Sequence, residues 1–373
     1  MTIQKSERLL SLDVFRGITI AGMILVNNPG SWSTIYPPLK HAAWHGCTPT
    51  DLIFPFFLFI VGVAITYSLT KRKERGDDKK KLILNIVRRG AVLFLLGLFM
   101  AAFPFFKFDT LRIPGVLQRI GVVYIFASVI FLYADKKTII YILSGLLIFY
   151  WAVMSFIPVP GVGYANLEPT TNLSAWLDNL LLSGHLWSST KVWDPEGILS
   201  TIPAIGSTLL GIIAGYWLRS KNDQVGKTLK LFLWGNALML LGYIWDGFFP
   251  INKSLWTSSY VLYTGGLAMI FLAFCYWIID VKGIKWWIKP FQVYGMNAIT
   301  VFFLSGLMAK GLYLIKVTSA AGEQVSLKTY LYTNLFLSWL PPLNASLLWA
   351  VTYIVFWLGL MWILYSKKIF IKV

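Results

Sequence analysis

The chain has 373 residues, of which 57% are hydrophobic and only 13% are charged, about half the share of an ordinary soluble domain. This composition excludes a soluble globular protein, because apolar runs recur along the whole length and leave no room for a separate soluble domain. The formal net charge of +17 does not indicate nucleic-acid binding, since the basic residues cluster in short loops beside the apolar runs.

The apolar runs predict an all-α polytopic membrane protein with one integral membrane domain over residues 1–373. The basic clusters, which include Lys5 and Arg8, 71–81, 219–230, 282–289 and Lys372, all fall on the same side of a ten-span chain, so we expect them and both termini on the cytoplasmic side. The His41 loop, 157–196 and 313–342 would then lie outside. The ten predicted spans lie near 10–28, 51–70, 84–105, 112–133, 138–157, 197–218, 228–248, 257–279, 291–313 and 343–365.

Three further features complete the expected architecture. Asp13 and Arg16 interrupt any signal-peptide core, so the first span is expected to stay as an uncleaved anchor. Cys47 and Cys275 lie in different settings, which predicts no disulfide. The segment 326–340 is too short to cross the bilayer and is expected to form an interfacial or re-entrant helix.

Ionisable residues within the spans need a partner or a water-filled cavity, because each costs at least about 2.5 to 3.5 kcal/mol at the bilayer centre. Asp13 and Arg16 could form a structural i,i+3 pair, and Asp51 could cap the second span. Arg119 has no acid nearby in sequence, which favours contact with a bound anion. The candidates are Asp13, Arg16, Asp51, Arg112, Arg119, Asp246 and Lys310.

The loop after the first span carries two of the three histidines, His41 and His45. Histidine accepts and donates protons near neutral pH, so this loop is the first place to expect chemistry. The i,i+4 spacing would permit a metal site with Asp51 or His185, but no metal-binding motif supports one. An aromatic belt at the membrane interface, formed with Trp44, is the non-catalytic alternative.

The outer loop 157–196 combines tryptophans with carboxylates. Trp187 and Trp193 could stack on the apolar face of a sugar while Asp194 and Glu196 bind its hydroxyls or amine. The same tryptophans are equally typical of an interfacial belt. The loop is therefore a candidate sugar site that needs a second line of support.

Six segments, taken in order along almost the whole chain, resemble the heparan-α-glucosaminide N-acetyltransferase family. They are LDVFRGITIAGMILVNNPG (12–30), HAAWHGCTPTDLIFPFFLFIVG (41–62), LRIPGVLQRIGVVY (111–124), DPEGILSTIPAI (194–205), INKSLWTSSYVLYTGG (251–266) and YGMNAITVFF (294–303). The resemblance implies an enzyme that takes acetyl from cytosolic acetyl-CoA and delivers it to the amine of a terminal glucosamine, or a related amino sugar, across the membrane. The animal enzyme has an extra lumenal domain before this region, so a smaller acceptor is expected here.

The family's motif histidine falls on His41 and its motif asparagine on Asn27. His45 stands where a relative has asparagine, so catalysis is not assigned to it. His41 would act as general base or acetyl carrier, Asn27 would stabilise the oxyanion, and Asp51 would fix the histidine tautomer. No metal is expected.

The resemblance also implies donor and acceptor sites. Acetyl-CoA is a co-substrate whose charged nucleotide stays on the basic face, so its pantetheine arm must thread inward through the bundle. A bacterial plasma membrane is the expected location, with His41 near the periplasmic face. The donor candidates are Arg16, Arg88, Arg89, Arg119 and Asn297, and the acceptor candidates are Trp44, Asp194 and Glu196.

Three alternatives stay open. An amino-sugar transporter could use the same polar residues as a substrate path, although its two related halves with interrupted helices are not seen. An O-acyltransferase of a cell-surface glycan could use the same histidine on a hydroxyl. A non-catalytic membrane subunit would leave Arg119 unexplained. The expected partners are the lipid bilayer, acetyl-CoA and an amino-sugar or glycan acceptor, with no nucleic acid, and a homodimer is left open.

Overall fold

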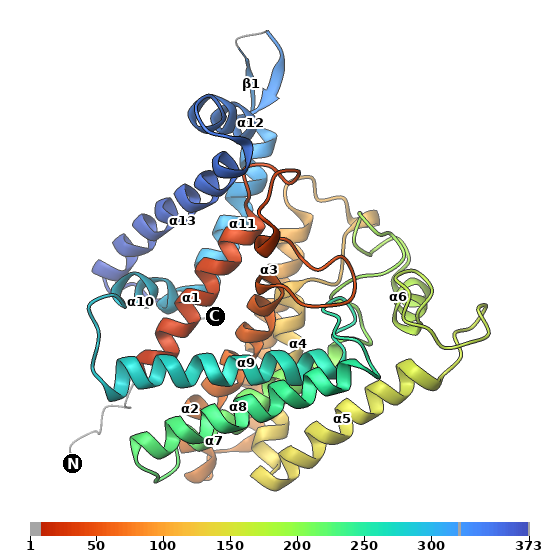
Figure 1. The fold of residues 1–373 in the computed structure, drawn as a ribbon, viewed down its shortest axis with the longest axis vertical. Helices are drawn as coiled ribbons and strands as arrows, with labels where there is room; N and C mark the ends of the chain where they lie inside the picture. The colour runs from red at the N-terminus through yellow and green to blue at the C-terminus, as the bar shows by residue number, and fades with distance from the viewer. Residues whose placement is uncertain (1–8, 320–321, 372–373) are drawn as a thin grey trace.

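The chain folds into a bundle of membrane-spanning helices in the computed structural model, which describes residues 9–319 and 322–371 (Figure 1). The charges predicted at Lys5, Arg8 and Lys372 lie outside these residues. Within them, nine helices are long and apolar enough to cross a membrane, or ten if one bent pair counts as a span. The predicted polytopic all-α class is therefore confirmed.

The membrane-crossing helices agree with nine of the predicted spans to within several residues. They are α1 (Leu10–Asn27), α2 (Ile53–Glu74), α3 (Lys79–Ala102), α4 (Val116–Tyr133), α5 (Lys136–Phe156), α7 (Thr201–Leu218), α8 (Gln224–Asp246), α9 (Ser258–Tyr276) and α13 (Pro342–Ser366). Short 3₁₀ turns cover Pro37–Leu39, Pro49–Leu52 and Phe108–Thr110, and a π-helical turn at Trp277–Val281 extends α9.

The remaining predicted span, 291–313, is broken rather than continuous. It consists of α10 (Lys289–Met296) and α11 (Ala298–Leu314), which are bent by 82° relative to each other. The break falls at Asn297, whose backbone is non-helical and whose side-chain oxygen accepts a hydrogen bond from Ile371 N at 2.9 Å. Docking of the C-terminal segment thus accompanies the bend, and hydropathy alone carried no sign of it.

The segments predicted to lie outside the membrane contain more structure than the sequence predicts. The 157–196 loop includes α6 (Leu173–Leu182), and the sixth span begins at Thr201 rather than at residue 197. The expected 326–340 helix is divided into α12 (Leu327–Tyr332) and a π-helical turn at Thr333–Leu337. A short hairpin, β1 (Lys316–Thr318) with β2 (Gln324–Ser326), precedes α12 and is the one departure from helix among the named elements.

Contacts between loops distinguish the two ends of the bundle. At one end, Lys73 Nζ donates to the carbonyls of Phe131 and Ala134 at 2.6 and 2.9 Å, which ties the end of α2 to the end of α4. At the other end, Gly46 N donates to Ile251 O at 2.7 Å, which joins the loop after α1 to the loop after α8. The loops that carry the site therefore meet at one end.

The core sits where α2 and α7 pack closely, and α7 is the most buried crossing helix. A Cβ atom added at Gly211 would lie 2.0 Å from the Phe59 carbonyl oxygen, so only glycine permits this approach of the two backbones. The close contact holds the N-terminal half of α2, which follows the 3₁₀ turn Pro49–Leu52 that contains Asp51.

Candidate active site

His41 faces a buried carboxylate. Its Nδ1 lies 2.6 Å from Asp51 Oδ1, and Asp51 is 1% exposed whereas the His41 side chain is half-exposed. The second carboxylate oxygen, Oδ2, accepts hydrogen bonds from Ala42 N and Thr48 N, both at 3.0 Å. One oxygen of Asp51 therefore closes the loop before α2 while the other holds the imidazole. An imidazole that donates from Nδ1 keeps its lone pair on Nε2, which faces away from this carboxylate.

Lys253, in the loop between α8 and α9, lies beside this pair and was missed by the sequence reasoning. Its Nζ is 3.1 Å from Nδ1 and 3.3 Å from Nε2 of His41, and 3.7 Å from Asp51 Oδ1. Burial lowers the pKa of Lys253, and the charges of Asp51 and Glu196 partly offset this effect. The only sequence signal was its place inside the family-like segment 251–266.

The Lys253 loop is held by hydrogen bonds on both sides. Asn252 Oδ1 accepts from Leu255 N at 2.9 Å, and Asn252 N donates to Thr257 Oγ1 at 3.0 Å. The Tyr260 hydroxyl, at the start of α9, donates to the Asp51 carbonyl at 2.6 Å. These bonds hold the Lys253 loop and Asp51 in one rigid frame. Because Asp51 also contacts His41, the side chains of His41, Asp51 and Lys253 keep their spacing.

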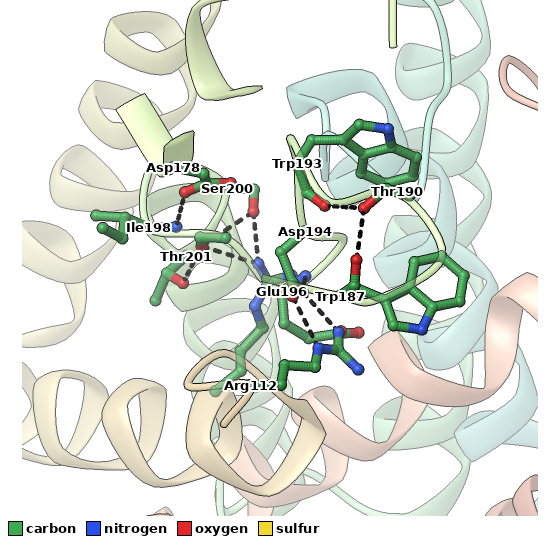
Figure 2. Close-up of polar contacts among 12 residues, drawn as sticks. Arg112, Asp178, Trp187, Thr190, Trp193, Asp194, Glu196, Ile198, Ser200 and Thr201 are labelled. Atoms are coloured by element: carbon green, nitrogen blue, oxygen red, sulfur yellow. Dashed lines mark hydrogen bonds and ion pairs between the residues drawn. The ribbon is translucent and has the colours of Figure 1, made fainter. Parts of the chain in front are cut away.

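Arg112 binds both carboxylates of the DPEG segment (Figure 2). Its Nε lies 2.7 Å from Asp194 Oδ2, and its Nη2 lies 2.6 Å from Asp194 Oδ1 and 2.6 Å from Glu196 Oε2. Burial alone would lower the pKa of Arg112, but the bond to Asp194 and the charge of Glu196 outweigh it and raise that pKa. Since α4 begins at Val116, Arg112 lies in a loop and not inside a span as predicted.

The two predicted acceptor carboxylates are therefore not equivalent. The Asp194 side chain is fully buried, and its Oδ1 also accepts from Glu196 N at 3.0 Å, so it has little capacity left for a ligand. The Glu196 side chain is almost buried, and its Oε2 accepts the bond from Arg112. Its negative charge raises the pKa of Arg112, which it contacts directly, and also acts to raise that of Lys253.

Three tryptophans form an aromatic wall next to these charges. The ring centroids of Trp44 and Trp193 are 5.1 Å apart, and those of Trp187 and Trp193 are 6.2 Å apart. Trp44 Nε1 donates to Leu167 O at 2.9 Å, while the Arg112 guanidinium lies 5.7 Å from the Trp187 centroid. The predicted acceptor residue Trp44 is thus joined to the 157–196 loop, although the two are far apart in sequence.

Arg119 lies deep behind the DPEG segment and is 2% exposed. Its Nη2 donates to Gly197 O at 3.2 Å and to the Ser200 hydroxyl, and its guanidinium lies 5.1 Å from the Trp256 centroid. Nearby Asp178 accepts from Ile198 N at 2.8 Å through Oδ1 (Figure 2). Burial raises the pKa of Asp178 to about 6. Arg119 therefore supports the 194–200 turn at the end of the bundle that carries Asp194 and Glu196.

The other donor candidates lie elsewhere and are not brought together with Arg119. Arg16 Nη1 lies 3.4 Å from Asp13 Oδ1, as in the predicted i,i+3 pair, and donates to Gly295 O at 3.2 Å. Arg88 and Arg89 are exposed on α3, with Arg89 positioned 5.1 Å from the Tyr124 centroid. Asn297 is buried and uses Nδ2 to bind Ile369 O at 3.1 Å, in addition to its bond from Ile371 N.

A cavity of about 610 Å³ opens between α1, α3, α4 and α11 and adjoins the DPEG segment through Arg112. Asn27 lines this cavity, whereas His41 is not among its described lining residues. Lys310 also lines it and donates to the carbonyls of Met100 and Phe103, at the C-terminal end of α3. The described lining includes Lys107, Arg112 and Lys310 but no carboxylate, so the cavity is electropositive.

The remaining histidines and Cys47 do not extend the His41 group into a metal or thiol site. His45 Nδ1 lies 3.4 Å from Asn252 Nδ2, and His185 Nδ1 lies 2.8 Å from Leu111 O. Across residues 9–319 and 322–371, no three His, Cys, Asp or Glu side chains are placed to hold a metal ion. Burial, with the charge of Asp51, raises the pKa of Cys47 to about 12, so its thiol stays protonated and is a poor nucleophile.

Comparison with known proteins gives a consistent family. The model for the catalytic region of heparan-alpha-glucosaminide N-acetyltransferase matches residues 8–244. The mouse protein of that name is 32% identical over 426 aligned positions, covering 99% of this chain and 61% of the mouse protein. The human protein is 33% identical over 353 positions, covering 79% of this chain and 52% of the human protein. The chain thus spans between half and two thirds of the length of these relatives.

Proposed function

Because this chain belongs to the heparan-alpha-glucosaminide N-acetyltransferase family, we propose that it is an integral membrane N-acetyltransferase with one catalytic domain over residues 1–373. It moves acetyl from acetyl-CoA to the amine of a terminal glucosamine or related amino sugar. The observation that carries the proposal is the imidazole of His41 held by buried Asp51 with its Nε2 unencumbered by that carboxylate. This arrangement matches the histidine–carboxylate half of an acyl-transfer triad.

His41 Nε2 supplies the base or the nucleophile. A sugar ammonium must lose a proton before its nitrogen attacks the thioester carbonyl, and Nε2 is the acceptor for that proton. The new C–N bond forms as the C–S bond breaks, and the coenzyme A thiolate then takes up a proton. If Nε2 attacks first, it carries the acetyl group and passes it to the amine in a second transfer. Both routes use the same nitrogen, and a labelled donor separates them.

Asp51 and Lys253 prepare this histidine. Asp51 fixes the Nδ1–H tautomer and stabilises the imidazolium that forms when Nε2 takes a proton. The Lys253 ammonium, 3.3 Å from Nε2, lies where negative charge develops on the carbonyl oxygen of the tetrahedral intermediate. We assign Lys253 to oxyanion stabilisation together with Asn27, which reaches the thioester from the lining of the 610 Å³ cavity.

The donor enters from the end of the bundle that carries the basic loops, which we assign to the cytosol. Arg16, Arg88 and Arg89 bind its phosphates, and the pantetheine arm leads toward the electropositive cavity, whose amide side chains match its amide groups. The buried contacts of Arg119 and Asn297 favour positioning roles for these two residues over direct contact with the donor.

The acceptor binds at the opposite face, which we assign to the periplasm of a bacterial plasma membrane. Trp44 and Trp193 stack on the apolar face of the sugar ring, and Glu196 takes the protonated amine or a hydroxyl beside Lys253. Asp194 acts through Arg112, because its two oxygens are already engaged. Glu196 is therefore the acceptor-contacting member of this acidic pair.

Purified protein incubated with acetyl-labelled acetyl-CoA and a panel of amino sugars tests the proposal. We expect base-stable N-acetyl product with wild-type protein and with the matched control His45→Ala, and loss of product by at least about a thousandfold with His41→Ala. Transient label on the protein would identify the acetyl-histidine route. A His41→Ala protein that acetylates glucosamine at a near wild-type rate contradicts the proposal, and a base-labile ester product would identify an O-acyltransferase instead.

A further inference from the structure

A second cavity of about 500 Å³ lies between α5, α7, α8 and α9, outside the His41 site. All four helices are membrane-crossing, so the cavity is a groove within the bilayer region. Most of its lining is apolar, with Leu147, Leu210, Leu238 and Leu262 contributed by the four helices. Over most of its length, therefore, its occupant must be apolar.

One end of the groove is cationic. Lys136 begins α5 and Lys230 lies in the second turn of α8, and their Nζ atoms are 5.7 and 5.4 Å from the ring centroid of Trp217. Neither lysine forms an ion pair with a carboxylate in the described part of the chain, and no described lining residue is acidic. Two positive charges thus converge on one indole ring.

Trp217 adds an unsatisfied hydrogen-bond donor at the same place. It is 8% exposed, and its indole Nε1 is buried with no acceptor among the described residues. A buried N–H group without an acceptor is costly, so an oxygen atom of a ligand is the expected partner. The end of the groove therefore offers two cations and one free donor to an oxyanion.

The length of the groove matches one leaflet. Its α5 lining runs from Lys136 to Ile148, which at a rise of about 1.5 Å per residue is about 18 Å. Half of a hydrocarbon core of about 30 Å is about 15 Å. An acyl chain that starts at the lysines would thus reach the bilayer midplane near Ile148.

We infer that this groove is a binding site for an anionic glycerophospholipid. The phosphate lies between Lys136 and Lys230 and accepts the Trp217 hydrogen bond, and an acyl chain follows the α5–α8 side of the groove. A free phosphate would leave the apolar length of the groove unfilled. The site is independent of the proposed acetyl transfer.

Native mass spectrometry of the purified protein, titrated with phosphatidylglycerol or with phosphatidylcholine of the same acyl chains, tests the site. Each lysine near the phosphate should raise the affinity for an anionic lipid about fivefold. With two lysines, we expect phosphatidylglycerol to bind roughly 30-fold more tightly than phosphatidylcholine. K136Q/K230Q should reduce this preference to about twofold. K137Q, which removes the exposed neighbouring lysine outside the groove, should leave it unchanged. Glycerol 3-phosphate, which has the head group but no chains, should not displace the lipid.

Three results would overturn the inference. The first is equal affinity for the anionic and zwitterionic lipids, and the second is an undiminished preference in K136Q/K230Q. The third is a homodimer that takes up no lipid, because the groove would then be the contact between two copies of the chain.

Discussion

Lys253 places an ammonium group beside both ring nitrogens of His41, in a loop fixed by Asn252 and Tyr260. If it stabilises the oxyanion, Lys253→Met should lower kcat by about 10²- to 10³-fold, as removal of one such donor does elsewhere, with a smaller change in KM. Lys253→Arg should recover part of kcat, because it keeps the charge. Steady-state kinetics with a soluble amino sugar provide the measurement.

Lys40, one residue before His41, serves as the matched control for this change. It is exposed in the same loop as His41, and Lys40→Met should leave kcat within about twofold. An unchanged kcat in Lys253→Met would remove Lys253 from the mechanism and leave oxyanion stabilisation to Asn27.

Asp178 provides a residue-scale test of how the outer turn is held. Burial raises its pKa to about 6, above the ordinary value of about 3.9, so the folded protein keeps a proton that the unfolded chain releases as pH rises from about 4 to 6. Its contribution to stability therefore falls through that window. Asp178→Asn should be more stable than wild type at pH 7, by at most about 3 kcal/mol, and equally stable near pH 4.

Thermal unfolding in detergent between pH 4.5 and 7 measures this difference, with Asp109→Asn, at an exposed acid in the loop between α3 and α4, as the control. A wild-type and Asp178→Asn pair that show the same pH dependence would mean that Asp178 is ionised in the folded protein throughout.

At the scale of residues, the family resemblance suggested that Asp51 contacts His41, and the two side chains are in contact, but it gave no role to Lys253. His41 and Asp51 lie ten positions apart in one loop, so a contact between them is a local matter. Lys253 is 212 positions from His41 and reaches it only because the loops after α1 and α8 meet at Gly46. A pairing of that kind depends on helix packing, which hydropathy does not encode.

At the scale of secondary-structure elements, the closest helix approach that a glycine substitution can test is the one between α1 and α10. A Cβ atom added at Gly17 would lie 1.8 Å from the Phe291 carbonyl oxygen, a backbone atom that cannot move aside alone. Gly17→Ala should therefore push α10 away from α1 and lower the unfolding temperature by several degrees, with a cost of the order of 1 to 3 kcal/mol. Scanning fluorimetry of detergent-purified protein measures the shift.

Gly359, on α13, is the matched control, because a Cβ atom there meets nothing within 4 Å. Gly359→Ala should be neutral or slightly stabilising, since alanine is the better helix former. Equal unfolding temperatures for Gly17→Ala and wild type would show that α1 and α10 are not in close contact.

Hydropathy alone predicted the nine continuous crossing helices, because a helix that crosses a bilayer needs an apolar stretch of matching length. Hydropathy did not predict the break at Asn297, whose side chain forms hydrogen bonds with the C-terminal segment. It also did not predict α6, because ten residues are too few to be recognised as a membrane span. Composition and hydrophobic periodicity therefore do not predict elements that depend on tertiary contacts.

At the scale of the whole molecule, the proposed transfer across the membrane requires that one face of the bundle binds the donor and the opposite face binds the acceptor. The basic loops lie at one end of the crossing helices, while His41, Asp51, Lys253 and the tryptophan wall lie at the other. The electropositive cavity with Asn27 reaches from the bundle to Arg112, beside Asp194 and Glu196. Transfer across the membrane follows only if the thioester passes from the first end to the second.

Sealed proteoliposomes with a known orientation test this requirement most directly. Labelled acetyl-CoA is supplied only on the side of the 71–81 loop, and glucosamine is confined to the side of residue 41, with His41→Ala vesicles as the control. The account predicts labelled N-acetylglucosamine on the glucosamine side with wild-type protein and none with His41→Ala. Product that forms only when both substrates share one side would contradict it.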